Sequence, residues 1–154
     1  MTRSDLLFSI RYAVRVLERH SRMWSKTSNI IRFTSLLSGS AAIASLSATN
    51  NTLVIVSGVI FACLQALEFA LNPSNIATQS SVESQKYAML MAYQKKYSKD
   101  DLEKEYGIIS ANDPIIISDL LKEIAYNDVV LEQGASAEEL YKKTISHRFY
   151  RILS

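Results

Sequence analysis

The stretch that decides the fold is residues 33–71, which read FTSLLSGSAAIASLSATNNTLVIVSGVIFACLQALEFAL. Its first 35 residues, 33–67, contain no acidic or basic side chain apart from the thiol of Cys63. A polar cluster at residues 48–52 divides the stretch and is typical of the end of one helix and the capped start of the next. We therefore expect apolar helices at residues 30–48 and 53–71, each close to the roughly 20 residues that cross a bilayer.

Charged residues are divided unevenly along the 154-residue chain, although the net charge is only +2. Residues 1–32 hold seven Lys and Arg against two acidic residues, whereas residues 97–136 hold nine Asp and Glu against three Lys. The loop between the two expected spans is uncharged. Because positively charged flanks stay on the cytoplasmic side of a membrane, this pattern places both termini in the cytoplasm.

A soluble alternative stays open. A helix that is apolar all round also occurs at the centre of a soluble bundle. The first span is diluted by serine, and a carboxylate such as Glu68 costs about 2.5–3.5 kcal/mol at the centre of a bilayer. The second hypothesis is therefore a soluble all-α interaction or assembly subunit, with residues 33–71 buried in a bundle or in an obligate partner.

The rest of the chain predicts further helices. Apolar residues at three- and four-residue steps indicate an amphipathic helix over residues 4–26, and a helix over 75–97 follows the break at Asn72-Pro73-Ser74. Ser98 is expected to cap a helix over 99–106 that Gly107 stops. Asn112-Asp113-Pro114 predicts the start of a helix that ends before Gly134, and Ser136 with Glu139 predicts the capping box of a last helix to about residue 153.

The predicted fold class is therefore all-α, because residues 115–117 are the only candidate strand. We expect a basic amphipathic helix over 1–29, a helical transmembrane hairpin over 30–72 and cytoplasmic helices over 73–154 that form one structural unit. One cysteine excludes a disulfide framework within the chain and a zinc site built on several cysteines.

The sequence contains no constellation of catalytic residues. It lacks a nucleophile elbow, a phosphate-binding glycine loop and a His-Glu-x-x-His motif. Cys63 lies in the most apolar segment, where a packed cysteine is favoured over a nucleophile, and we interpret His20 and His147 as surface or interfacial residues. The acidic residues of 100–105 lack the spacing of a calcium loop and are interpreted as a solvated helix face. We expect no enzyme activity, no metal and no cofactor.

Small and polar residues recur at helical spacing within the expected spans. The second span carries a stripe of small residues that permits close approach of helices in lipid: Gly58, Ala62, Ala66 and Ala70. The first span carries a hydroxyl-rich face, and the second adds a polar patch near its end, so that the candidate pore or packing residues are Thr34, Ser38, Ser45, Gln65 and Glu68, with Ala42 and Thr49 on the same face. Either the hydroxyl face packs on the small-residue stripe within one hairpin, or several copies assemble and line a polar path.

A basic stripe precedes the first span and consists of Arg11, Arg15, Arg19, Arg22 and Lys26. Anionic lipid can attract each such side chain by about 1 kcal/mol. The alternative is pairing with the acidic segment 97–136, within a chain or between neighbours. Sequence-specific nucleic-acid binding is not expected, because only Tyr12 and Trp24 offer stacking faces among these cations.

This layout resembles the SLATT-type two-transmembrane effectors of bacterial anti-phage systems. The resemblance covers roughly residues 5–97. It rests on the basic, aromatic-containing first helix, the two closely spaced spans and the helix with Tyr87, Leu90, Tyr93 and Tyr97 after an Asn-Pro break.

The resemblance implies a membrane-permeabilising or pore-forming effector that oligomerises in the bacterial inner membrane on a trigger and arrests the infected cell. It implies as partners the lipid membrane, further copies of the chain and, as regulator, a nucleotide-signal synthase or a reverse transcriptase complex. It assigns no catalytic residues.

Overall fold

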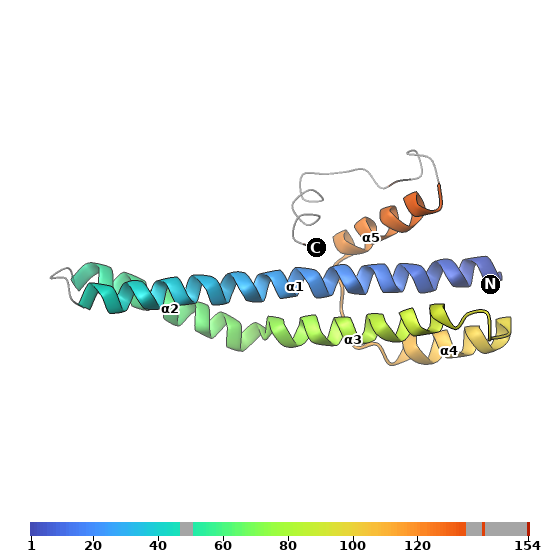
Figure 1. Ribbon diagram of the computed structural model, residues 1–154, viewed down its shortest axis with the longest axis horizontal. Coiled ribbons are helices and arrows are strands. Elements are labelled where there is room, and N and C mark those ends of the chain that lie inside the picture. Colours follow the sequence, from blue (N-terminus) through green and yellow to red (C-terminus); the bar gives the residue numbers. More distant parts are fainter. Residues whose placement is uncertain (47–50, 135–139, 141–153) are drawn as a thin grey trace. The chain divides into compact units, whose positions relative to one another are not determined.

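The computed structural model describes residues 1–46, 51–134, 140 and 154, and it is helical with no strand among them. Its helices, shown in Figure 1, are α1 (Arg3–Leu46), α2 (Asn51–Leu71), α3 (Pro73–Ala92), α4 (Lys99–Ala111) and α5 (Asp119–Glu132). The all-α class is thus confirmed for the described residues. The predicted last helix, including the Ser136–Glu139 capping box, lies outside them.

The chain divides into two compact units, which are described separately. The packed unit comprises Met1–Met23 and Ala77–Ser154, and the helix-pair unit comprises Trp24–Ile76. Helix α1 runs without a break from the predicted amphipathic segment into the predicted first span, so it contributes residues to both units.

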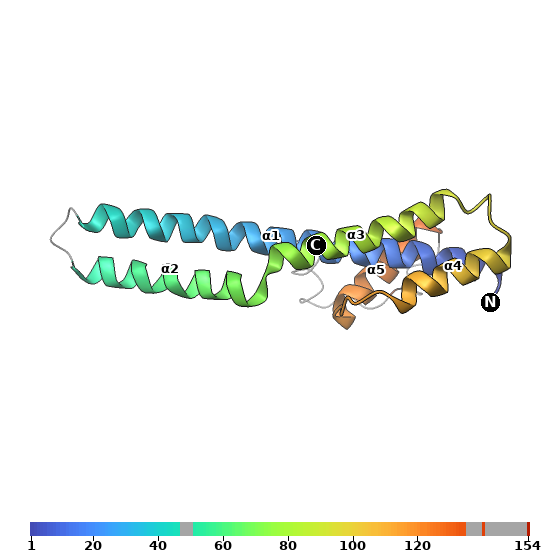
Figure 2. The same ribbon diagram turned by 90° about the horizontal axis from the view of Figure 1, so that it is seen from below.

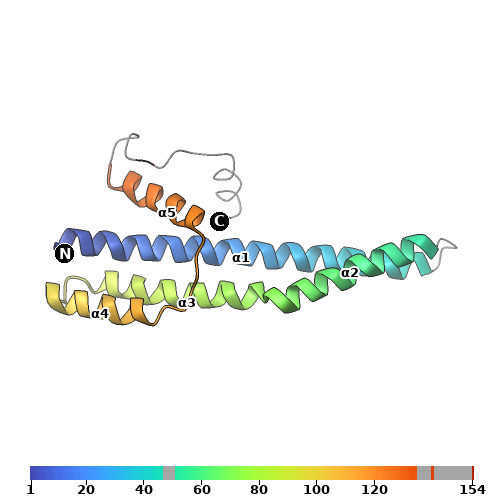
Figure 3. The ribbon, with the colours of Figure 1, turned by 180° about the vertical axis from the view of Figure 1, so that it is seen from behind.

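The packed unit has the apolar core of the molecule. Leu6, Ile10 and Leu17 of α1 are at most 1% exposed and belong to one cluster with Leu102 of α4 and Ala125 of α5. Burial of a leucine or isoleucine side chain contributes about 1.5–3 kcal/mol. Figure 3 shows α5 next to α1 and α4 beside α3, an arrangement supported by ring contacts between Phe8 and Tyr126 and between Tyr87 and Tyr106.

The helix-pair unit comprises the C-terminal part of α1, the whole of α2 and the first residues of α3, to Ile76. Its segments of α1 and α2 lie side by side in Figure 2. Two contacts fix their direction. Arg32 Nε lies 2.7 Å from Glu68 Oε1, and a Cβ on Gly39 would lie 3.5 Å from the ring of Phe61. Because a later residue of α1 meets an earlier residue of α2, the helices are antiparallel.

A single residue separates α2 from α3. Asn72 has φ 42°, a left-handed conformation that asparagine tolerates better than most residues. Pro73 then takes the first position of α3, where its missing N–H costs no hydrogen bond. The predicted break is confirmed, but α3 begins two residues earlier than expected and ends at Ala92, because residues 93–97 form a turn.

The predicted end of the helix after Ser98 is wrong. Ser98 caps α4 as expected, with its Oγ accepting a hydrogen bond from Asp101 N at 3.2 Å, but the helix continues through Gly107 to Ala111. A glycine inside a helix costs only about 1 kcal/mol relative to alanine, so it does not by itself end the helix.

The predicted start of α5 at Asn112-Asp113-Pro114 is also wrong. Asp113 Oδ1 accepts a hydrogen bond from Ile115 N at 3.0 Å, which closes a local turn instead of a helix cap. The three isoleucines that follow are β-branched, which lowers their helix propensity, and they have no regular secondary structure. Helix α5 begins only after Ser118. Its end is as predicted, with Gly134 in the left-handed region at φ 78°.

Candidate functional site

The candidate site is the surface of the helix-pair unit, which exposes many large apolar side chains. Of the 21 exposed large apolar side chains among the described residues, 14 belong to this unit. They are Ile30, Phe33, Leu36, Leu37, Ile43, Leu53, Ile55, Val56, Val59, Ile60, Phe61, Leu67, Phe69 and Leu71. A concentration of exposed apolar side chains of this kind indicates an interaction site for protein or membrane.

By length and composition, one described stretch is long and apolar enough to cross a membrane: Thr52–Ala92, which covers α2 and α3. Its most apolar 18-residue window has a mean hydropathy of 2.1, and none of that window is buried within the chain. The described part of α1 is not such a stretch. The prediction of a membrane-length apolar helix is thus confirmed for α2, and crossing by α1 stays a prediction.

The buried face of α1 in this unit includes two serines. Ser28 and Ser35 are 2% and 3% exposed, and Ile31 between them is 8% exposed. Spacing of three and four residues places all three on one helix face. Neither serine hydroxyl has a hydrogen-bond partner. Sequence reasoning missed Ser28 and Ser35 because it followed the neighbouring face that begins at Thr34.

The predicted pore or packing residues have different surroundings in the structure. Thr34 Oγ1 donates to the carbonyl oxygen of Ile30 at 2.8 Å within its own helix, and Ser38 is half-buried. Gln65 and Glu68 line one hollow of about 300 Å³ with Phe69 and Asn72. The side chains of Ala42 and Ser45, and the whole of Thr49, lie outside what the structure describes.

The ion pair between Arg32 and Glu68 ties the two helices together. The side chain of Arg32 is 55% exposed and that of Glu68 is 22% exposed, and Arg32 Nε lies 2.7 Å from Glu68 Oε1. Glu68 was predicted as a pore or packing residue, whereas Arg32 was only counted among the basic residues that precede the first span. The available signal was that these two residues bound the uncharged segment on either side.

The small-residue stripe of α2 does not pack against α1. A Cβ built on Gly58 meets no atom within 4 Å, and Ala62, Ala66 and Ala70 are exposed. The arrangement in which the hydroxyl face of α1 covers this stripe within one chain is therefore not the one observed. The stripe is left uncovered by the described residues.

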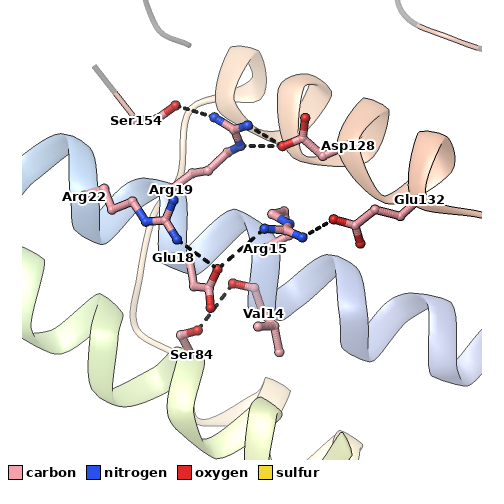
Figure 4. Close-up of polar contacts among 9 residues, drawn as sticks. All are labelled: Val14, Arg15, Glu18, Arg19, Arg22, Ser84, Asp128, Glu132 and Ser154. Atoms are coloured by element: carbon pink, nitrogen blue, oxygen red, sulfur yellow. Dashed lines mark hydrogen bonds and ion pairs between the residues drawn. The ribbon is translucent and has the colours of Figure 1, made fainter. Parts of the chain in front are cut away.

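Two residues of the basic stripe pair with α5 inside the packed unit, as Figure 4 shows. Arg15 pairs with Glu132. Arg19 donates from Nε to Asp128 Oδ2 at 2.6 Å and from Nη1 to Ser154 Oγ at 2.8 Å. Two cations of the stripe thus engage the acidic segment within the chain.

The remaining cations of the stripe are more open to solvent. Arg22 is 61% exposed and lies 3.5 Å from Glu18, which also lies 3.8 Å from Arg15. Arg11 and Lys26 are exposed. An exposed ion pair contributes about 0–1 kcal/mol, so Arg22 can exchange its partner for another anion at low cost.

His20 was predicted as a surface or interfacial residue, and the surface alternative is wrong because the side chain is buried in the packed unit. It is 5% exposed, and its Nδ1 lies 2.8 Å from Ser80 Oγ. Burial lowers the pKa of His20, and the charge of Asp113 partly opposes this change. Burial also raises the pKa of Tyr87 to about 12. His147 lies outside the described residues.

Within the described ranges no three His, Cys, Asp or Glu residues lie close enough together to hold a metal ion. Cys63 is exposed on α2, which differs from the packed position expected for it. Asp100, Asp101 and Glu103 are exposed in the first turns of α4, where negative charge is favourable.

No protein-family model, curated protein or solved structure matches this chain.

Proposed function

We propose that the chain is a membrane-permeabilising or pore-forming effector of a bacterial anti-phage system. In this proposal α2 and the C-terminal part of α1 insert into the inner membrane as a helical hairpin, with both termini in the cytoplasm. A trigger then drives several copies to assemble, and the assembly permeabilises the membrane and arrests the infected cell.

The observation that carries the proposal is the uncovered apolar surface of α2. None of its most apolar window is buried by the chain itself, and Phe69 is 91% exposed. In water such a surface is unfavourable by about 25 cal/mol per Å² of apolar area. Within the helix-pair unit, the described part of α1 does not cover it, which argues against the form of the soluble hypothesis in which this helix would.

The inverted distribution of residues supports the same proposal. The helix-pair unit buries Ser28 and Ser35 and exposes leucine, isoleucine and phenylalanine. In lipid, helices associate through small and hydroxyl residues because the tails already satisfy the apolar side chains. The uncovered stripe from Gly58 to Ala70 leaves a second helix surface for further copies.

The role in defence rests on the resemblance to SLATT-type effectors, which also supplies the candidate regulators, a nucleotide-signal synthase or a reverse transcriptase complex. The test is expression in bacteria with and without the trigger, with membrane potential and growth as readouts. We expect depolarisation and arrest only when the trigger is present. Unchanged potential and growth with the trigger present would remove the effector role.

In an alternative function, a protein covers the exposed apolar surface instead of lipid. An obligate protein partner could cover α2, and the chain would then be a soluble assembly subunit. Glu68 favours this reading, because it lies within α2 and a carboxylate near the bilayer centre costs about 2.5–3.5 kcal/mol. Fractionation of cells after a carbonate wash separates the two, since recovery in the soluble fraction without detergent supports the subunit.

A further inference from the structure

The ion pair between Arg32 and Glu68 does not lie at the edge of the exposed apolar surface. On α1 the exposed apolar residues lie on both sides of Arg32, with Ile30 at 58% and Phe33 at 64% exposure. On α2 they continue past Glu68, where Phe69 is 91% and Leu71 is 44% exposed. If lipid covers this surface, the pair lies about one helical turn inside it.

Glu68 is the only charged residue of α2, and the 14 residues of α1 that follow Arg32 carry no charge. The apolar part of the helix pair therefore contains one positive and one negative group, and they are partners at 2.7 Å. As a pair they are neutral. A single charge near the bilayer centre costs about 2.5–3.5 kcal/mol, and intramembrane charges are usually paired.

We propose that Arg32 and Glu68 enter the bilayer as a pair, and that neither charge enters efficiently when its partner is absent. The pair holds the two helices in register and allows each charge to leave water with its counter-ion. This inference rests on the proposed function, because it concerns how the same surface reaches lipid. It assigns a positioning role to two residues and does not depend on oligomerisation or pore formation.

Cys63 provides the reporter for the test, since it is the single cysteine of the chain and is exposed on α2. The full chain is reconstituted into vesicles of phosphatidylethanolamine and phosphatidylglycerol and treated with a membrane-impermeant maleimide. The fraction of Cys63 protected from modification measures insertion. The variants are Arg32→Leu, Glu68→Leu, the double leucine variant, and the exchange Arg32→Glu with Glu68→Arg.

We expect each single variant to reduce the ratio of protected to modified Cys63 on the order of tenfold, because each leaves one charge without its partner. The exchange and the double leucine variant should return to within about twofold of the unaltered chain, because neither carries an unpaired charge. The control is Lys122→Leu, which removes an exposed ion pair with Asp119 in the packed unit and should leave protection unchanged.

The outcomes separate the two proposals. If Cys63 of the unaltered chain is modified in these vesicles, both the proposed function and the proposal that Arg32 and Glu68 enter the bilayer as a pair are overturned. If Cys63 is protected equally in the unaltered chain and in both single variants, only the proposal of entry as a pair is overturned. Loss of protection in the exchange variant as large as in the single variants also overturns it, because the cause would then be the individual side chains and not their pairing.

Discussion

Arg19 and Asp128 join α1 to α5 through a hydrogen-bonded ion pair whose side chains are only 15% and 18% exposed. The pair is the most shielded of the ion pairs found among the described residues for the basic stripe, since the side chains of Arg15 and Arg22 are 32% and 61% exposed. A hydrogen bond to a charged group contributes more as solvent is excluded from it. Arg19 therefore serves the packing of the packed unit.

The first prediction concerns this pair. Arg19→Ala should raise the exchange rate of amide hydrogens in α5, because Asp128 loses its partner, with a loss of local stability of about 1–3 kcal/mol. Hydrogen exchange with mass spectrometry of α5 peptides measures it. Lys122→Ala is the control and lies within α5 itself. It should lower the local stability measured by exchange by less than about 0.5 kcal/mol, because its pair with Asp119 is exposed. Equal effects of both substitutions would contradict the assignment.

The second prediction concerns the core of the packed unit. Leu17 is 1% exposed and lies in the apolar cluster, so Leu17→Ala should destabilise this unit by about 2–5 kcal/mol through lost burial and the cavity left behind. Ile116 is 93% exposed and offers the control. Ile116→Ala should leave thermal stability within about 0.5 kcal/mol. A large effect at residue 116 would mean that it is covered.

The third prediction is a dependence of stability on pH. The pKa of His20 lies below its ordinary value of 6.5 because the ring is buried, so the unfolded chain binds a proton more readily than the folded one. The stability contributed by the neutral ring is complete above about pH 6.5 and is lost as the pH falls through the lower folded value. Chemical denaturation between pH 7.5 and about pH 4.5 should show this loss.

His20→Gln is the comparison for that measurement, since glutamine can still hydrogen-bond to Ser80 but does not titrate. The part of the pH dependence that begins near pH 6.5 should disappear in this variant. A profile of His20→Gln identical to that of the unaltered chain would show that His20 does not contribute.

At high pH Tyr87 should give the opposite dependence, in which stability falls as the pH rises. The pKa of Tyr87, about 12, lies above the unfolded value of 10, so its contribution is complete below pH 10 and is lost as the pH rises toward 12.

The fourth prediction separates packing within one chain from assembly between chains. A Cβ on Gly39 would already be in van der Waals contact with the ring of Phe61, at 3.5 Å. The three further side-chain carbons of Gly39→Leu should therefore displace this ring and lower the thermal stability of the chain in detergent. Gly58→Leu should leave that stability unchanged, because no atom lies within 4 Å of the new Cβ. It should instead reduce cross-linked oligomers in membranes. Loss of stability at Gly58 would place the stripe inside the chain.

The sequence was most informative where a single helix decides the structure. The run from Leu53 to Leu71 is apolar without interruption except at Gln65 and Glu68, and α2 spans it. Ser98 predicted the start of α4, because a cap depends only on the next three residues. Gly107 and Asn112-Asp113-Pro114 led to wrong helix bounds. A glycine occurs within a helix as well as after its end, and an Asn-Asp-Pro sequence forms a turn as well as a helix cap. The flanking residues decide between these alternatives.

Contacts between helices could not be predicted from one helix at a time. The charge pattern suggested that the basic stripe could pair with residues 97–136, but the partners Asp128 and Glu132 follow from where α5 lies against α1. The pair of Arg32 with Glu68 likewise depends on the register of two antiparallel helices. His20 was misplaced because its burial comes from α3, which lies 60 residues away in sequence at Ser80.

The most direct test of the account is the accessibility of Cys63 in the full chain added to vesicles. If α2 lies in lipid, Cys63 resists a membrane-impermeant maleimide until detergent is added. Ile116→Cys in a Cys63→Ala background reports the packed unit and should react at once, because residue 116 is 93% exposed. Rapid modification of Cys63 in vesicles, at the rate seen for residue 116, would contradict the membrane role of this chain.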